Sequence, residues 1–173
     1  MTKNEFLAVF AILLVIILFA LPNFSSSKVQ ARDVQRKNDL RHIRAALTDY
    51  FKDFSAYPRA RDGKILACGA PEKLEPCEWE KDVLRDLRDP IYPPYIERLP
   101  RDPQHERTYV YISNTRNFQL LASLEDSHDR EYNKKVEDRN ISCGTKICNF
   151  GVTSAGDVLP EEEMPPENPP TAQ

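Results

Sequence analysis

The chain begins with a long apolar segment and continues with polar sequence of helical and then strand periodicity. Residues Phe6 to Leu21 are sixteen apolar residues in succession. As an α-helix they would extend about 24 Å, slightly less than the ~30 Å hydrocarbon core of a bilayer. Pro22 to Phe24 bring the segment close to spanning length. The pattern predicts a hydrophobic transmembrane or assembly helix over residues 1–24.

Three simpler interpretations of this apolar segment stay open. A cleaved secretory signal needs a small-residue cleavage site, and Ala20-Leu21-Pro22 is a poor one. A plain single-span anchor fits the segment but gives no reason for Glu5 or Pro22. A buried core helix would need more apolar surface around it than the rest of the chain supplies.

A second helical pattern follows, over about residues 28–54. Gly is absent from Met1 through Tyr57, and Pro22 is the only proline before Pro58. We therefore expect one continuous helix of about 50 residues, with a kink or local break at Pro22 and an end near Tyr57-Pro58. Its second half is amphipathic, because its apolar residues recur at steps of three and four: Leu40, Ile43, Leu47, Tyr50, Phe51 and Phe54.

Strand signals come late in the chain. The segments Thr108 to Ile112 and Phe118 to Leu124 are rich in β-branched and aromatic residues and flank a turn sequence, which is typical of a hairpin. We expect a third strand around Lys146 to Thr153. Before them we expect a short helix over Glu78 to Leu87 and an extended, proline-rich loop from Asp89 to Pro103.

Together these elements predict an α+β fold. A long N-terminal helix, with a membrane half and an amphipathic half, would pack on a small antiparallel sheet of about three strands. The head comprises residues 25–158, including the second half of the helix. Residues 159–173 are rich in Pro and Glu and lack the apolar content to fold, so we expect a disordered tail.

Composition argues against several classes of function. The net charge of −3 gives no basic field for nucleic acid. The five glycines form no phosphate-binding loop. His42, His105 and His128 share no metal or triad spacing, and no nucleophile and base are placed together. We therefore expect no enzyme activity and no cofactor.

The four cysteines all follow the apolar segment. Their short spacings suggest two local loops, Cys68–Cys77 and Cys143–Cys148, out of three possible pairings. Such bridges persist in an oxidising compartment. The alternative is one four-thiolate zinc site, although the wider spacing, C-x8-C, is not that of zinc ribbons.

Charged residues gather in two places. An acidic loop contains Glu125, Asp126 and Asp129, which are weak calcium candidates because oxygen-rich loops bind calcium. Basic residues interleave there, so we expect a solvated loop and no metal. A basic cluster also follows the apolar segment, and as a solvated helix face it needs no function. It would otherwise face acids of adjacent heads: Lys28, Arg32, Arg36, Lys37, Arg41 and Arg44.

Glu5 is the most specific feature, because a carboxylate beside a membrane helix is costly. It could simply cap the helix N-terminus, where the macrodipole favours an anion. The functional alternative is a partner, the α-amine of Met1 of a neighbouring subunit. That pairing would remove a buried charge and set the axial register of a fibre.

Glu5 at the head of an unbroken apolar helix that ends at Pro22 resembles the N-terminal helix of type IV pilins and secretion pseudopilins. The likeness extends to about Leu124 and is most specific in the first sixty residues. It continues in Ala31-Arg32-Asp33-Val34-Gln35-Arg36-Lys37-Asn38-Asp39-Leu40, Tyr57-Pro58, Leu99-Pro100-Arg101-Asp102-Pro103, Tyr109-Val110-Tyr111 and Phe118-Gln119-Leu120.

This resemblance implies a structural subunit that polymerises into a filament at the cell surface, for adhesion, motility or DNA uptake. Its partners would be copies of itself, the membrane before assembly, the assembly machinery and a prepilin peptidase. The head would lie outside the cytoplasm. Met1, Glu5 and Pro22 would act in assembly, and the N-terminal residue would be methylated.

Family precursors carry a basic leader that ends in Gly, and no Gly precedes Glu5 here, so we expect the sequence to be the mature chain. By the positive-inside rule, the basic cluster after the apolar segment would favour a cytoplasmic location of the head. A basic leader, since removed, would restore the orientation with the head outside. The alternatives are a pseudopilin of a type II secretion system and a monomeric, membrane-anchored binding module.

Overall fold

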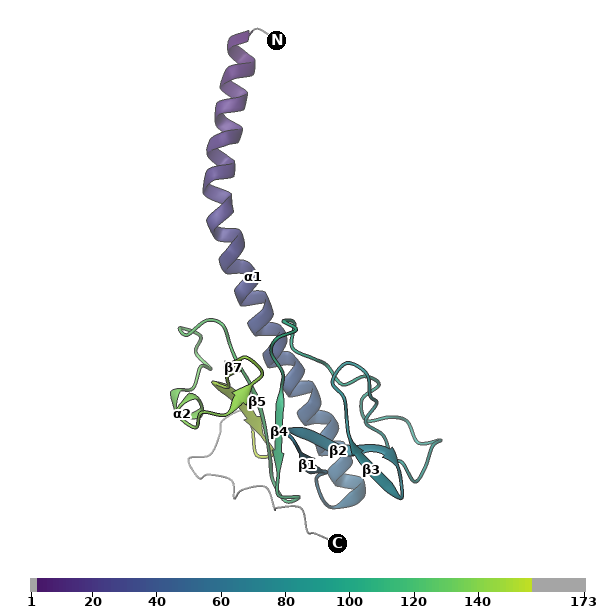
Figure 1. The fold of residues 1–173 in the computed structure, drawn as a ribbon. Coiled ribbons are helices and arrows are strands. Elements are labelled where there is room, and N and C mark those ends of the chain that lie inside the picture. The colour runs from purple at the N-terminus through teal and green to yellow at the C-terminus, as the bar shows by residue number, and fades with distance from the viewer. Residues whose placement is uncertain (1–2, 157–173) are drawn as a thin grey trace.

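A long helix extends from a small head of short antiparallel strands (Figure 1). The computed structural model describes residues 3–156, and within the helix it does not describe the side chains of residues 4, 8 and 16–25. Met1 and the tail 159–173 therefore lie outside the described residues. Figure 1 shows the N-terminal half of the helix projecting beyond the head, whereas its C-terminal half lies against the strands.

Helix α1 spans Lys3–Phe54 and has 52 residues, about 78 Å at 1.5 Å per residue. Its backbone remains helical through position 22, so no break occurs where we expected a kink or break, and Figure 1 shows one gently curved ribbon. The helix ends at Phe54 because Ser55 adopts a left-handed conformation, with φ 56°. The predicted end near Tyr57-Pro58 is confirmed.

No helical stretch among the residues with described side chains is long and apolar enough to cross a membrane. The last six residues of the apolar run Phe6–Leu21 lie outside that part of the chain. The membrane half of the predicted helix therefore stays a prediction.

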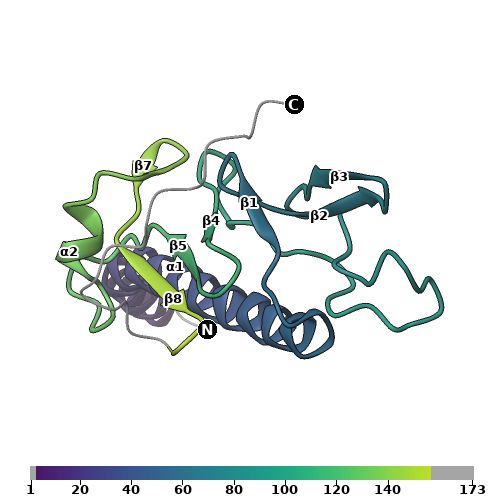
Figure 2. The ribbon, with the colours of Figure 1, turned by 90° about the horizontal axis from the view of Figure 1, so that it is seen from below.

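The second half of α1 packs on a three-stranded antiparallel sheet. The sheet has the order β4-β5-β8, formed by β4 (Val110–Ser113), β5 (Phe118–Ala122) and β8 (Phe150–Thr153). The helix contributes fully buried side chains at steps of three and four, including Leu40, Ile43 and Leu47. Figure 2 shows α1 running along the strands in the view from below. The α+β arrangement of helix against antiparallel strands is confirmed.

A second antiparallel sheet was not predicted. It has the order β1-β2-β3, formed by β1 (Arg59–Arg61), β2 (Lys64–Ala70) and β3 (Lys73–Pro76). Asp62 and Gly63 join β1 to β2 with φ 53° and 71°, the left-handed pair that a tight hairpin turn requires. The carbonyl of Gly63 accepts a hydrogen bond from Tyr111 N at 2.8 Å, which connects this sheet to β4. The head therefore has more strands than the single sheet of about three that we expected.

The predicted short helix over Glu78 to Leu87 is wrong. Glu80 has φ 68°, and the carboxylate of Asp82 accepts a hydrogen bond from Glu78 N, so the chain turns instead of coiling. Leu84 then forms an antiparallel bridge with Ile96. The apolar residues of this segment have the spacing of a helix face. Turn hydrogen bonds and strand pairing nevertheless determine its conformation.

The predicted third strand around Lys146 to Thr153 is divided. Its first part, β7 (Lys146–Ile147), pairs with β6 (Ser142–Cys143) in a small hairpin, and only β8 joins the main sheet. The turn of this hairpin contains Gly144 at φ +80°, where an added Cβ would lie 2.3 Å from the carbonyl oxygen of Glu106. A short helix, α2 (Lys134–Glu137), precedes the hairpin.

Two disulfides close the loops that the cysteine spacing suggested, Cys68–Cys77 and Cys143–Cys148. All four cysteines are buried, with exposures of 7%, 1%, 0% and 0% in chain order. The zinc alternative requires four thiolates, whereas these sulfurs are joined in pairs. Disulfides of this kind are typical of an oxidising, extracytoplasmic location.

We expect almost no thiol labelling of the native protein when it is unfolded without reductant, because both pairs are oxidised. Mass spectrometry after alkylation measures this directly. The same protein unfolded with reductant is the control and should take up label at all four cysteines. Labelling of all four without reductant would place the head in a reducing compartment.

Candidate functional site

The basic cluster of α1 faces the head and is paired there with carboxylates of two loops. We call this network the ionic clamp. Four cations of α1 take part, as two pairs whose members are four residues apart and therefore neighbours on the helix surface. The members from α1 are Arg32, Asp33, Arg36, Lys37 and Arg41, and the members from the loops are Asp102, Gln104, Glu125, Asp129 and Glu131.

Arg36 is the centre of the clamp and is completely buried. Its Nε and Nη2 donate to the two carboxylate oxygens of Asp102 at 2.8 and 2.9 Å, the bidentate geometry of strong ion pairs. Its Nη1 donates to Asp33 and to Glu125, each at 2.7 Å. Its Nη2 also donates to Gln104 at 2.9 Å. One guanidinium therefore joins the helix to both loops.

Asp33 holds the backbone of the loop that contains Glu125 and Asp126. Its side chain is buried, and its carboxylate accepts hydrogen bonds from Glu125 N at 2.9 and 3.0 Å and from Asp126 N at 2.9 Å. Arg32 donates to both oxygens of Glu125, at 2.6 and 2.5 Å. The start of this loop is therefore attached to α1 by both main-chain and side-chain contacts.

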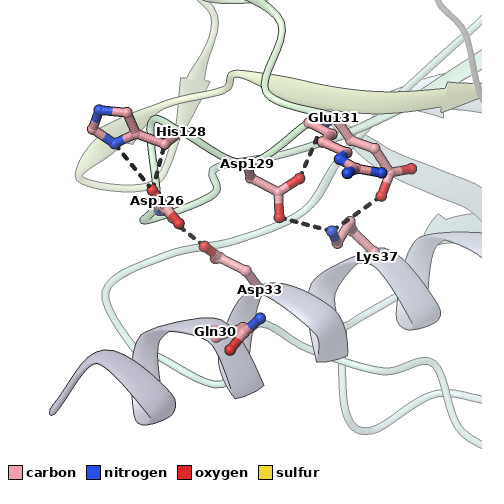
Figure 3. A pocket seen from close by; sticks show the side chains of 8 residues that line it. Gln30, Asp33, Lys37, Asp126, His128, Asp129 and Glu131 are labelled. Carbon is pink, nitrogen blue, oxygen red and sulfur yellow. Dashed lines mark hydrogen bonds and ion pairs between the residues drawn. The ribbon is translucent and has the colours of Figure 1, made fainter. Parts of the chain in front are cut away.

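The outer part of the clamp is more exposed. Lys37 Nζ lies 2.8 Å from Asp129 and 3.0 Å from Glu131, and Arg41 pairs with Glu131. Figure 3 shows Lys37 between these two carboxylates, beside an open pocket of about 480 Å³ between α1 and the loop. In the same view Asp126 lies over Asp33. The pocket contains both signs of charge, and Asp33, Lys37, Asp129 and Glu131 are already paired.

The clamp shifts the pKa of its members in the directions expected for ion pairs. Hydrogen bonds from Arg32 lower the pKa of Glu125 to about 2, although burial opposes this. Burial acts to lower the pKa of Arg36, but its hydrogen bonds with Asp102 and Glu125 outweigh burial and raise it. Burial acts to raise the pKa of Asp129, and the hydrogen bond from Lys37 outweighs burial and lowers it. These directions favour the charged forms of Glu125, Arg36 and Asp129 at neutral pH.

Asp39 lies one turn after Arg36 on α1. Its pKa shifts in the opposite direction to those of Glu125 and Asp129. Its carboxylate accepts a hydrogen bond from the Tyr109 hydroxyl at 2.7 Å. Burial raises the pKa of Asp39 despite this bond. Tyr109 is itself almost fully buried, and both burial and the contact with Asp39 raise its pKa.

The clamp has a structural role. An arginine guanidinium does not lose its proton in proteins, so the central group cannot act as a general acid or base. Its donors and the surrounding carboxylates instead fix two loops on the helix. The clamp therefore determines how the head is held on α1 just below the projecting half.

The structure corrects two expectations about charge. The basic cluster does not form a merely solvated face, because Arg32, Arg36, Lys37 and Arg41 pair within the chain. The acidic loop is likewise not simply solvated. The basic cluster of α1 and the acidic loop pair with each other.

The calcium candidates are divided among different contacts. Glu125 is held by Arg32 and Arg36, and Asp129 by Lys37. Asp126 accepts a hydrogen bond from His128 N at 2.8 Å. In the described part of the chain, no three His, Cys, Asp or Glu side chains are grouped as a metal site requires.

Asp102 and Gln104 were not predicted as functional residues. Asp102 belongs to the segment Leu99 to Pro103, which sequence patterns show only as a loop. A fully buried arginine was also not expected, since arginine is mostly exposed. The available signals were an acid between two prolines, Pro100 and Pro103, and the place of this segment in the family resemblance.

Of the three assembly candidates, Glu5 lies away from the clamp. Glu5 is in the first turn of α1, at the end of the helix furthest from the head in Figure 1. Met1 and the side chain of Pro22 are outside the described residues. The structure therefore places only Glu5 of these three, and it tests no contact between subunits.

The projecting half of α1 exposes large apolar side chains. Phe6, Leu7 and Ile12 are 66%, 65% and 60% exposed, whereas Leu40, Ile43 and Leu47 on the same helix are 0% exposed. Further large apolar side chains are also exposed on this half: Val9, Phe10, Leu13, Leu14 and Val15.

Comparisons of the chain with protein-family models, with curated proteins and with solved structures found no match.

Proposed function

We propose that this chain is the structural subunit of a type IV pilus-like filament at the cell surface. The observation that carries the proposal is the contrast within α1. Its second half is buried against the head, whereas its first half projects with exposed apolar side chains. Such a helix needs a further apolar environment, which the described part of one copy does not supply.

The size of the exposed apolar surface supports this. Burying one large apolar side chain is worth about 1.5–3 kcal/mol relative to exposure. The eight large side chains exposed between Phe6 and Val15 therefore represent on the order of 10 kcal/mol of unrealised stabilisation. A bilayer supplies that environment before assembly, and a bundle of identical helices supplies it afterwards.

In this proposal the head remains outside the cytoplasm, where its disulfides persist. The subunit is stored in the cytoplasmic membrane by its helix and handled there by a prepilin peptidase and the assembly machinery. Glu5 pairs with the α-amine of Met1 of a neighbouring copy and sets the register. The clamp supports the same function, since a rigid joint between helix and head lets the position of the helix in the bundle determine the position of the head.

Glu5→Ala tests the proposal. The variant should remain in the membrane fraction but fail to form fibres. Leaving the α-amine of the neighbouring copy buried without its partner costs about 3–5 kcal/mol, so each contact should weaken about 100-fold or more. Electron microscopy and quantification of sheared surface fibres measure the result.

Glu72→Ala is the matched control, because Glu72 is an exposed acid of the head. It should form fibres at the wild-type level. Normal fibres from Glu5→Ala would contradict the register role. Absence of fibres from the wild type would favour a monomeric membrane-anchored binding module, and fibres confined to the periplasm would favour a secretion pseudopilin.

A further inference from the structure

A second hollow lies beside the Cys68–Cys77 disulfide, and none of its residues belongs to the clamp. We call it the 81–87 pocket. Its volume is about 310 Å³. The end of β2 forms one wall and the loop after β3 forms the other, through Cys68, Gly69, Lys81, Asp82, Val83, Arg85 and Leu87.

The loop is extended here, and this explains which residues line the pocket. Leu84 is completely buried and is anchored to Ile96, whose carbonyl accepts a hydrogen bond from Leu84 N at 3.1 Å. Successive side chains of an extended chain point to opposite sides. Val83 and Arg85 therefore point away from the core, and every second residue from Lys81 to Leu87 lines the pocket.

The opposite wall is held in place by covalent and steric constraints. The Sγ atom of Cys68 lies 3.8 Å from the carbonyl oxygen of Val83, so the loop rests on the disulfide. Gly69 has φ +88°, and an added Cβ would lie 2.7 Å from the carbonyl oxygen of Lys73. The shape of this wall thus depends on a cysteine and a glycine that cannot be exchanged freely.

The charges in the pocket are not balanced. Lys81 and Arg85 supply two cations, and the one lining carboxylate, Asp82, already accepts a hydrogen bond from Glu78 N at 2.7 Å. Arg85 Nε is buried and has no hydrogen-bond partner among the described residues. By contrast, Arg36 donates five hydrogen bonds to carboxylates and an amide.

A buried donor without an acceptor is unfavourable, so native structures nearly always satisfy it with protein, water or a ligand. A guanidinium matches two oxygens of one planar or tetrahedral oxyanion in a bidentate pair. We propose that the 81–87 pocket binds the oxyanion group of a ligand, a carboxylate or a phosphate. Arg85 holds two of its oxygens, and Lys81 adds a second positive charge. This site is independent of the filament proposal.

The test uses the full chain in non-ionic detergent and inorganic phosphate as the probe. Phosphate should cause saturable NMR shifts of Arg85 Nε–H and of Gly69 N–H, whereas chloride at equal ionic strength should cause none. Acetate separates the two sources of the oxyanion. A saturable response to acetate alone assigns the pocket to carboxylates, and a response to phosphate alone assigns it to phosphate groups.

Arg85→Gln should weaken the binding about ten-fold or more, the loss expected for a hydrogen bond to a charged group. Arg116→Gln makes the same change at an exposed residue of the β4–β5 turn and should leave binding unchanged. The melting temperature without phosphate shows whether Arg85→Gln is folded. If it is not, Lys81→Gln at an exposed residue replaces it and should weaken binding several-fold.

The absence of a saturable response to both phosphate and acetate would overturn the proposal. A response that chloride reproduces would also overturn it, because general screening would then explain the shifts. Equal binding of phosphate by the wild type and a folded Arg85→Gln variant would also overturn the proposal.

Discussion

Replacing Arg36 with Met should lower the free energy of unfolding by about 3–5 kcal/mol, the usual cost of breaking a buried ion pair. Methionine fills much of the space of the arginine stem but removes the charge. Asp33 and Asp102 would then remain as buried carboxylates without the cation that compensates them, and Glu125 would keep only Arg32. A domain of this size has about 5–15 kcal/mol in total, so the loss should be obvious in a urea titration.

Lys52→Met on the same helix is the matched control. Lys52 pairs with Asp49 at 2.7 Å, but the two side chains are 68% and 58% exposed. An exposed pair contributes little to stability, so this variant should unfold close to the wild type. If Arg36→Met is as stable as Lys52→Met, the clamp does not stabilise the head. Its role would then be limited to orienting the two loops.

The long helix could be predicted from the sequence because its determinants are local. Apolar residues at steps of three and four, the absence of Gly and the Tyr57-Pro58 stop all act within a few residues of one another. The hairpin of β4 and β5 was predictable for the same reason. Its two β-rich segments are separated by a short polar turn and pair in order.

The β1–β2–β3 sheet was missed although one local signal was present. Asp62-Gly63 is the dipeptide that favours the tight turn of a hairpin. Its outer strands are too short to establish a pattern, since β1 has three residues and β3 has four. The pairing of these strands depends on a turn and a disulfide more than on a hydrophobic pattern.

The clamp could not be predicted because its pairs are distant in the sequence. Arg36 lies 66 residues from Asp102 and 89 from Glu125. Charged residues on a helix and in a loop have the same composition whether they are solvated or paired. Only the packing of β5 against α1 brings the loop after Ala122 to the start of the buried helix face, and that contact depends on the whole fold.

Acid should unfold the head between about pH 5 and pH 2, and Glu125 should contribute most of this sensitivity. Its pKa falls from 4.5 to about 2 on folding, and its side chain is only 12% exposed. A carboxyl group with a lowered pKa in the folded state stabilises the protein above its unfolded pKa. That stabilisation, about 3 kcal/mol, is lost as the pH falls through this window. Asp129 acts in the same direction, since Lys37 lowers its pKa.

Asp39 acts against this loss. Burial raises its pKa, so the folded state binds its proton more readily than the unfolded chain, and protonation relieves a cost of folding. Asp39 therefore offsets part of the acid sensitivity that Glu125 and Asp129 produce. Urea titrations of the full chain in non-ionic detergent at several pH values measure it.

Glu125→Gln separates this contribution from that of the other acids. The variant should be less stable than the wild type at pH 7, because Arg32 and Arg36 lose a charged partner. Its stability should also change much less between pH 5 and pH 2, because residue 125 no longer takes up a proton. Glu72→Gln, at an exposed residue, should keep the wild-type dependence on pH. If Glu125→Gln keeps that dependence too, acid acts at other groups of the head, and Glu125 contributes little to the loss of stability.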